Sequence, residues 1–280
     1  MRGLSPSIKS RILNVFKFLV VLFIASLYVF PFAIVVINSF KKTGEVILNP
    51  LTLPKEFRIS NYQEAAQRMR YFRGFFNTFV ITLFSISAIV IFSSMTAYIF
   101  ARKKWPINKI FFGIMVASMI ITFQAIMIPL VKIYGSMNML NNMWTLIYMY
   151  LGFGTAFAVF LYHGFIKSIP FELEEAALVD GASIFQTFWR IVFPLLKPVT
   201  ITLIILDALW IWNDFLLPSL ILISAEKRTL QLSTFYFYGT FTSNYGLAMA
   251  ALMLTIFPII VVSLFMQKYI IAGIIKGAIK

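Results

Sequence analysis

The sequence predicts an all-α polytopic membrane protein, and three observations support that fold class. Hydrophobic residues make up 60% of the 280 residues. Charged residues make up 12%, about half the share found in an average soluble domain, and the mean hydropathy is +0.89. Six segments are apolar over about the 20 residues that a helix needs to cross the hydrocarbon core of a bilayer. These predicted spans are approximately 18–38, 75–101, 109–131, 143–166, 198–223 and 247–272.

Residues 1–17 are predicted to be an N-terminal tail, with basic side chains that end at Lys17. The apolar run that follows is longer than the roughly 7–15 residues of a signal-peptide core, and no small-x-small cleavage site comes after it. We therefore expect residues 18–38 to be a retained first span. The 39–74 loop carries Pro50 and Pro54 and then a short capped helix from Ser60. Two interpretations of this loop stay open, a solvated connector and a contact surface for a partner protein.

Six spans place both termini on the same side of the membrane, and the basic residues favour one side by a small margin. Fourteen of the 24 Lys and Arg residues lie in the tails and loops on the side of the termini, and ten lie on the opposite side. This excess favours cytoplasmic termini. A tail of residues 273–280 would follow the last span. The chain is thus predicted to be a multi-pass protein of the cell membrane, with one membrane domain over residues 18–272.

The charge and the cysteine count exclude several classes of protein. A formal net charge of +14 would suggest nucleic-acid binding in a soluble chain. Here the basic residues cluster at the ends of apolar segments, where they serve as membrane anchors. Cysteine is absent, which excludes disulfides, thiolate metal sites and a cysteine nucleophile.

A polar island, residues 168–197, separates the fourth and fifth predicted spans. Pro170 suits a first helical position, and the acidic residues from Glu172 onward fall where a helix dipole favours negative charge. Gly181 can adopt the left-handed conformation that ends a helix. Ser183 and Gln186 form a capping-box pattern for a second helix, which we expect Pro194 to end. The island is therefore predicted to be a helix-turn-helix knob between two spans.

The core of the island is Glu175-Ala176-Ala177, then three residues, Gly181, nine residues, and Ile191-Val192-Phe193-Pro194. This pattern resembles the EAA loop of ABC importer permeases, the cytoplasmic segment that docks into a groove on the ATPase subunit. Phe193 stands where the family usually has Leu. The alternative is an amphipathic helix that rests on the bilayer surface, but such helices favour Lys and Arg on the polar face, and this segment carries four acidic residues.

The resemblance extends over nearly the whole chain and is most similar to the smaller permease of carbohydrate importers of the maltose-transporter type. The matching stretches are Asn38-Ser39-Phe40-Lys41, Leu53-Pro54, Asn61-Tyr62, Ala97 to Arg102, Trp212 to Pro218, Thr229 to Leu232, Tyr245 to Ala250, Gln267 to Tyr269, Gly273 and Lys276 to Ala278. The resemblance implies a six-helix type I ABC importer permease core and a di- or oligosaccharide as substrate. It also implies four kinds of partner: a second, larger permease, two ATPase subunits, an extracytoplasmic solute-binding protein and the lipid bilayer, with no nucleic acid.

The resemblance further implies a transport subunit that is not itself an enzyme and holds no cofactor or metal. ATP and Mg would be bound by the partner ATPase subunits, and the sequence contains no Gly-x-x-x-x-Gly-Lys-Ser/Thr phosphate loop. The residues expected to couple the permease to the ATPase are Glu175, Ala176, Ala177, Asp180 and Gly181. Small side chains at 176 and 177 would allow close approach, Gly181 would permit the turn, and Glu175 would pair with a basic group of the ATPase.

Polar residues in and near the spans are the candidates for a substrate path. Asp207 and Asp214 are seven residues apart and would share one helix face. Asp214, Gln124, Asn213 and Trp212 are the path candidates, and the alternative for each is a bond or packing contact between helices. Asp207 matches no motif, so its role stays open. His163 is the only histidine and is expected to be an interface residue rather than a metal ligand.

Three other functions compete with carbohydrate import. A permease for an amino acid, a peptide or phosphate would share the island. A secondary transporter could couple uptake to protons through Asp207, Asp214 and His163, but it would usually show internal repeats, and none stands out. A membrane-embedded enzyme would need a pattern such as His-Glu-x-x-His or Gly-x-Ser-x-Gly, and neither occurs.

Overall fold

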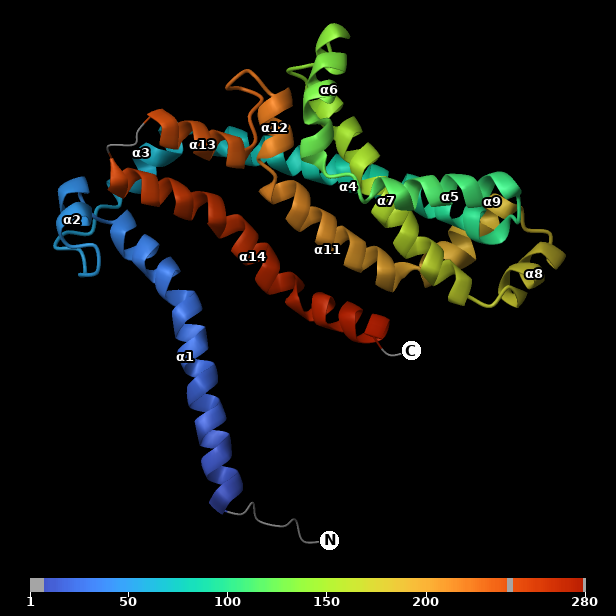
Figure 1. Cartoon of the computed structure of the whole chain (residues 1–280), viewed down its shortest axis with the longest axis horizontal. Coiled ribbons are helices and arrows are strands. Elements are labelled where there is room, and N and C mark those ends of the chain that lie inside the picture. The colour runs from blue at the N-terminus through green and yellow to red at the C-terminus, as the bar shows by residue number, and fades with distance from the viewer. Residues whose placement is uncertain (1–7, 241–243, 279–280) are drawn as a thin grey trace. The chain divides into compact units, whose positions relative to one another are not determined.

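The computed structural model describes residues 8–240 and 244–278, with side-chain surroundings for 13–235, 237–238 and 244–265. Every regular element in these ranges is a helix, which confirms the all-α prediction (Figure 1). The elements are α1 (Ile8–Ser39), α2 (Thr43–Leu48), α3 (Ser60–Arg68), α4 (Tyr71–Arg102), α5 (Pro106–Ser118), α6 (Phe123–Ser136), α7 (Met143–Ser168), α8 (Glu172–Val179), α9 (Ile184–Thr187), the π-helix η1 (Phe188–Val192), α10 (Phe193–Leu195), α11 (Lys197–Asn213), α12 (Leu216–Ile221), α13 (Leu230–Thr240) and α14 (Tyr245–Ala278).

Four helices among the described residues are long and apolar enough to cross a membrane, namely α1, α4, α7 and α14. Two bent pairs meet the same test as pairs: α5 with α6, and 184–195 with α11. The described chain therefore offers from four to six spans by length and composition. Helix α1 begins at Ile8, and α14 continues to Ala278, so much of both predicted tails is helical. Residues 1–7 and 279–280 of those tails lie outside the described residues.

The predicted 109–131 span is not one straight helix. Helices α5 and α6 meet at 104° across residues 119–122. Ile120 and Ile121 donate backbone N–H groups to Ala117 and Ser118, which closes tight turns in place of the α-helical pattern. A run of β-branched residues from Ile120 to Thr122 lowers helix propensity at this point. The sequence pattern of apolar residues alone did not reveal the break.

The predicted 198–223 span also divides, because α11 ends at Asn213. Asp214 has an extended backbone, with ψ at 129°, and its carboxylate accepts the backbone N–H of Leu216 at 3.0 Å. An aspartate that bonds the backbone two residues ahead favours a turn over a continuing helix. Helix α12 then begins at Leu216.

The chain divides into two compact units, and residues 70–235 with 257–280 form the larger one. Its core is built on α4, α7 and α11, whose fully buried side chains include Ile89, Tyr150, Tyr162 and Leu203. Gly154 of α7 lies at a tight contact among these helices. A Cβ on Gly154 of α7 would lie 2.6 Å from Cδ1 of Ile89 on α4 and 3.6 Å from the Trp210 ring of α11.

Two loops of the larger unit are joined through Asn141, which has a left-handed backbone with φ at 56°. Its side-chain oxygen accepts the backbone N–H groups of Ile223 and Ser224, and the Lys227 ammonium group donates to its backbone carbonyl. These bonds connect the 137–142 turn to the segment that follows α12. The start of α7 and the end of α12 are thereby held together.

The smaller unit contains residues 1–69 and 236–256. Within it, the buried side-chain amide of Asn61 donates to the carbonyl oxygens of Ser39 at 2.8 Å and Lys41 at 3.0 Å. Gly246 packs directly on the same backbone, because a Cβ there would lie 2.1 Å from the Lys41 oxygen. Burial raises the pKa of Tyr238 to about 12, so its hydroxyl stays protonated and donates to the Ala248 carbonyl. These contacts explain the Asn-Ser-Phe-Lys, Asn-Tyr and Tyr-Gly stretches as structural features.

Candidate functional site

The polar island folds into two short helices joined by a tight turn, as the sequence predicts (Figure 1). Helix α8 begins at Glu172, so Pro170 precedes the helix and does not take its first position as expected, and three acidic residues lie in the first turn. Gly181 adopts φ of +84°. The Ala182 N–H donates to the Ala177 carbonyl and the Gly181 N–H to the Leu178 carbonyl, which is the Schellman pattern of helix ends. The turn therefore depends on a residue at position 181 that tolerates a left-handed backbone.

The predicted capping box is present at the start of the second helix. The Gln186 N–H donates to the Ser183 hydroxyl oxygen at 3.2 Å, and the Ser183 N–H donates to the Gln186 side chain at 2.8 Å. These bonds satisfy two backbone donors of α9 that would otherwise have no partner.

The prediction that Pro194 ends this helix is wrong. The chain stays helical through η1 and α10, and the 73° bend comes at Leu196, between Leu195 and Lys197. Pro194 lies in the first turn of α10, where a missing N–H costs little. The π turn of η1 directly precedes it and accommodates the changed hydrogen-bond pattern.

Helix α8 presents one face to the protein and another to its surroundings. Glu174 and Ala177 are buried. Glu175, Ala176, Val179 and Asp180 are exposed, and Val179 is 87% exposed. Of the five residues predicted to couple to an ATPase, Ala177 thus points inward, Gly181 shapes the turn, and the other three lie on the accessible face. That face combines carboxylates with an apolar side chain.

The buried face of α8 contains a residue that the sequence pattern did not single out. The Glu174 side chain is 2% exposed and forms a salt bridge with Arg102 at 2.7 Å. The Tyr98 hydroxyl donates to its other oxygen at 2.8 Å. Arg102 also donates to the Ile169 carbonyl at 3.0 Å. Two features of the sequence could have pointed to this contact. The island has two adjacent glutamates, Glu174 and Glu175, and Tyr98 and Arg102 lie four residues apart at the end of the second predicted span.

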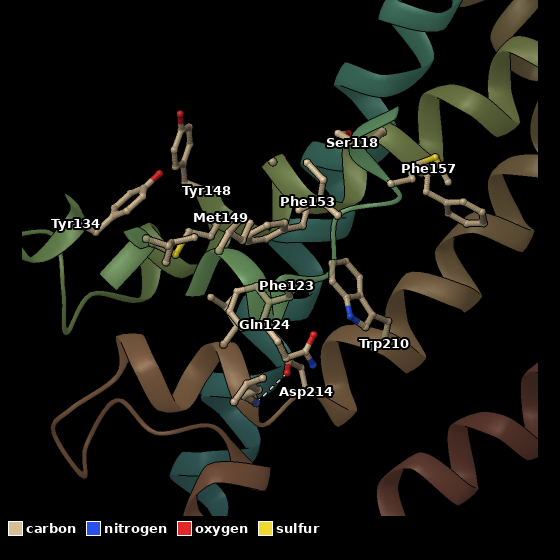
Figure 2. Close-up of a pocket in the computed structure, with 18 residues that line it drawn as sticks. Ser118, Phe123, Gln124, Tyr134, Tyr148, Met149, Phe153, Phe157, Trp210 and Asp214 are labelled. Atoms are coloured by element: carbon tan, nitrogen blue, oxygen red, sulfur yellow. Dashed lines mark hydrogen bonds between the residues drawn. The ribbon is translucent and has the colours of Figure 1, made fainter. Parts of the chain in front are cut away.

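A second feature is a cavity of about 740 Å³ inside the larger unit, here called the central cavity. Its lining comes from α5, α6, α7, α11 and α12 and from the break between α5 and α6 (Figure 2). The lining is mostly apolar and aromatic, with Phe123, Phe153, Tyr148 and Trp210 among its residues. Gln124 and Asp214 supply polar groups. A largely apolar cavity with a few polar groups is typical of small-molecule sites.

Asp214 both lines the central cavity and holds its wall together. One carboxylate oxygen accepts the Tyr150 hydroxyl at 2.8 Å, and the other accepts the Leu216 N–H. Tyr150 is fully buried, and its ring packs edge-on against Trp210 with centroids 5.5 Å apart. Asp214 therefore fixes the positions of α7 and α12 beside the cavity. A structural clamp and a path residue were the alternatives for this residue, and its geometry is compatible with both.

The other polar candidates lie outside the lining of the central cavity. Trp212 is buried and packs edge-on against Phe75. Asn213 is exposed, and its amide nitrogen donates to the Leu209 carbonyl of its own helix. The structure thus brings Gln124 and Asp214 together and separates them from Asn213 and Trp212.

Asp207 and His163 also lie away from the cavity lining. Asp207 is 4% exposed inside α11, and its Oδ2 has no hydrogen-bond partner among the described residues. The His163 ring packs on Phe112 with centroids 4.1 Å apart. Within the described part of the chain, no three acidic or histidine side chains gather in a way that could hold a metal ion. Asp207 and Asp214 do not share a helix face, because α11 ends before Asp214.

Long apolar helices, a cavity at a broken helix and an exposed two-helix knob are the features expected of a transport subunit in a membrane. The chain belongs to the family described as "Binding-protein-dependent transport system inner membrane component", which matches residues 64–276. It is an ABC importer permease, as the sequence resemblance predicted.

Two relatives illustrate the family. The chain is 46% identical over 254 residues to a probable starch degradation products transport system permease protein, AmyC, of Thermoanaerobacterium thermosulfurigenes, covering 91% of this chain and 92% of that protein. It is 36% identical over 258 residues to the melibiose/raffinose/stachyose import permease protein MelC of Bacillus subtilis, covering 92% and 93%.

A solved structure shows the same fold. A chain of a bacterial ABC transporter involved in the import of the acidic polysaccharide alginate superimposes with a TM-score of 0.81, covering 95% of this chain and 99% of that one. The two sequences are 24% identical. At this sequence identity, the structural similarity establishes the shared fold and does not indicate the solute.

Proposed function

We propose that this permease moves a carbohydrate, most simply a di- or oligosaccharide, from an extracytoplasmic solute-binding protein into the cytoplasm. The observation that carries the proposal is the aromatic lining of the central cavity, together with relatives whose names specify starch degradation products and melibiose, raffinose or stachyose. Flat aromatic faces suit the apolar faces of sugar rings, and Gln124 and Asp214 could bond sugar hydroxyls. A volume of about 740 Å³ accommodates a small oligosaccharide.

The polar island would deliver the work of ATP hydrolysis. In this proposal the exposed face of α8 docks into a groove of an ATPase subunit, and Glu175 and Asp180 face basic groups there. Ion pairs at an exposed surface contribute little, but partial burial on docking would strengthen them. This arrangement puts the island and both termini in the cytoplasm. A second permease and two ATPase subunits, which bind ATP and Mg, would complete the complex.

The test is reconstitution of the whole complex in proteoliposomes with its solute-binding protein. We expect uptake of a labelled oligosaccharide that requires ATP inside the vesicles and stops when the ATPase phosphate-binding lysine is replaced. Competition with amino acids, peptides and phosphate tests the alternative solute classes. Uptake driven by a proton gradient without ATP would instead support a secondary transporter, and uptake of a non-sugar solute alone would refute the carbohydrate assignment.

A further inference from the structure

The connection between the polar island and the membrane helices depends on three side chains, here called the latch: Tyr98 and Arg102 of α4, and Glu174 of α8. Tyr98 and Arg102 are four residues apart in the last turns of α4, so they lie on the same face of the helix. Both donate to the Glu174 carboxylate, one to each oxygen. The Arg102 guanidinium also lies 5.6 Å from the centroid of the Phe171 ring. One arginine thus contacts the residue after α7, the residue before α8 and the first turn of α8.

Apolar packing between α4 and the island is incomplete at this corner. A second cavity, of about 430 Å³, lies between the two. Met95 and Ile99 of α4 line one side of it, and Leu178 and Phe185 of the island line another. Side chains that face a cavity of this size do not hold each other in place. Tyr98 does contact the Phe188 ring, with centroids 5.1 Å apart. The hydrogen bonds and the salt bridge that join α4 to α8 are those of the polar latch.

The latch also decides which glutamate is free to meet a partner. Glu174 has its two oxygens occupied and is almost completely buried, whereas the adjacent Glu175 is exposed. A buried carboxylate with a paired guanidinium resists separation, because breaking the pair would leave an uncompensated charge in the interior. A displacement of α8 by a partner bound to its exposed face would therefore be transmitted to α4 through Glu174.

Helix α4 is continuous from Arg102 back to Ile89, a rise of about 20 Å. There the Ile89 side chain packs on Gly154 of α7, where a Cβ would also lie 3.6 Å from the ring of Trp210, which lines the central cavity. We propose that Arg102 and Tyr98 are positioning residues that fix the island to α4 through Glu174, so that a displacement of α8 moves the wall of the central cavity. The inference rests on the proposed docking of the island to an ATPase subunit.

The experiment compares Glu174→Gln and Arg102→Lys with the unaltered permease in the reconstituted complex. Both changes keep a polar side chain of similar length. The first removes the negative charge, and the second removes the planar fork that contacts two acceptors. We expect the ATPase subunits to copurify normally and ATP hydrolysis to continue. Solute uptake per ATP hydrolysed should fall about tenfold for each variant, and less for Tyr98→Phe.

Two matched variants separate the latch from its neighbours. Glu175→Gln alters the adjacent, exposed carboxylate and should weaken retention of the ATPase subunits while the latch stays closed. Lys104→Gln removes an exposed positive charge two residues beyond Arg102 and should leave uptake per ATP unchanged. A loss of coupling in Lys104→Gln equal to that in Glu174→Gln would overturn the inference, because the loss of any one charge near the end of α4 would then explain both.

A structural readout does not depend on transport. The chain has no native cysteine, so a single cysteine can be introduced at Ala177 on the buried face of α8. A maleimide reagent should label it slowly in the parent complex and several-fold faster when Glu174→Gln or Arg102→Lys is added. Equal labelling rates with unaltered coupling would refute the latch. An unaltered complex without ATP-dependent uptake would instead refute the proposed function, and in that case the labelling rates still test the latch.

Discussion

The polar island takes its shape from a continuous stretch, residues 168–197, whereas the central cavity is lined by five helices that span the sequence from Ser118 to Leu217. In the island, backbone bonds at Gly181 and the Ser183 capping box fix each turn locally. In the cavity, the positions of side chains depend on how α7, α11 and α12 pack. A substitution in the island should therefore act by straining the backbone. A substitution at the cavity should act by changing side-chain volume or by leaving a buried polar group unpaired.

Among the substitutions that test this difference, Gly181→Val should cause the largest loss of uptake. Nothing lies within 4 Å of a Cβ at this position, so the cost comes from the φ of +84° and not from a clash. A left-handed backbone costs an ordinary L-residue about 1–2 kcal/mol, and a β-branched residue suits it least. We expect the uptake rate to fall about tenfold or more. Gly181→Asn, which tolerates this conformation, should retain most of the uptake. Similar losses for Val and Asn would mean that side-chain volume matters here.

Asp214→Ala should give the next largest effect, at the cavity. The change leaves the buried Tyr150 hydroxyl without its acceptor, which costs about 1–3 kcal/mol of stability. The double variant with Tyr150→Phe should recover much of that loss in a thermal unfolding assay. Uptake should stay low in the double variant if Asp214 also contacts the solute, and it should recover if the carboxylate serves only as a clamp.

Substitutions of the two tryptophans of α11 should have smaller effects on uptake, and these effects should differ from each other. Trp210→Leu removes an aromatic face from the central cavity, and we expect the oligosaccharide concentration for half-maximal uptake to rise severalfold. Trp212→Leu removes a ring that packs on Phe75 outside the cavity lining. It should lower thermal stability and leave the concentration dependence unchanged. The reverse result would contradict a solute path through the central cavity.

The smallest effect is expected from Gly154→Ala. A Cβ here would meet the flexible end of Ile89, which has to move, so the loss should be about 1 kcal/mol and partly offset by the better helix propensity of alanine. Ile89→Val alone should cost about 0.5–1.5 kcal/mol. The two losses should be less than additive when combined, because valine leaves room for the new methyl group. Full additivity would show that the α4–α7 contact adjusts elsewhere.

The difference between the two regions also explains what could be predicted from the sequence. The acidic first turn, the glycine stop and the Ser183–Gln186 box act over three or four residues, so the shape of the island could be predicted directly. The break between α5 and α6 could not, because residues 119–122 are as apolar as their neighbours and contain neither Pro nor Gly. Of the path candidates, Gln124 and Asp214 line one cavity, whereas the places of Trp212 and Asn213 depend on the rotation of α11, which periodicity does not fix.

The latch illustrates a different limit. Glu174 and Glu175 look alike in the sequence, and the family pattern drew attention to the second. Which of them is buried depends on Tyr98 and Arg102, more than 70 residues earlier in the chain. Contacts between residues so far apart in the chain depend on the tertiary structure, and they can hardly be predicted from a single sequence.

The π turn η1 makes room for an extra residue in the second half of the island. Its hydrogen bonds join residue i to residue i+5, so one π turn holds about one residue more than an α turn. The five residues from Phe188 to Val192 therefore cover about the rotation of four α-helical residues. Deleting one of them would let the segment close into an ordinary α-helix with α8 still in about its present rotation relative to α11. Deleting a residue within α11 would instead turn everything before it by about 100°, and the carboxylates of the island would then be aimed in a new direction, although no residue that carries them had changed.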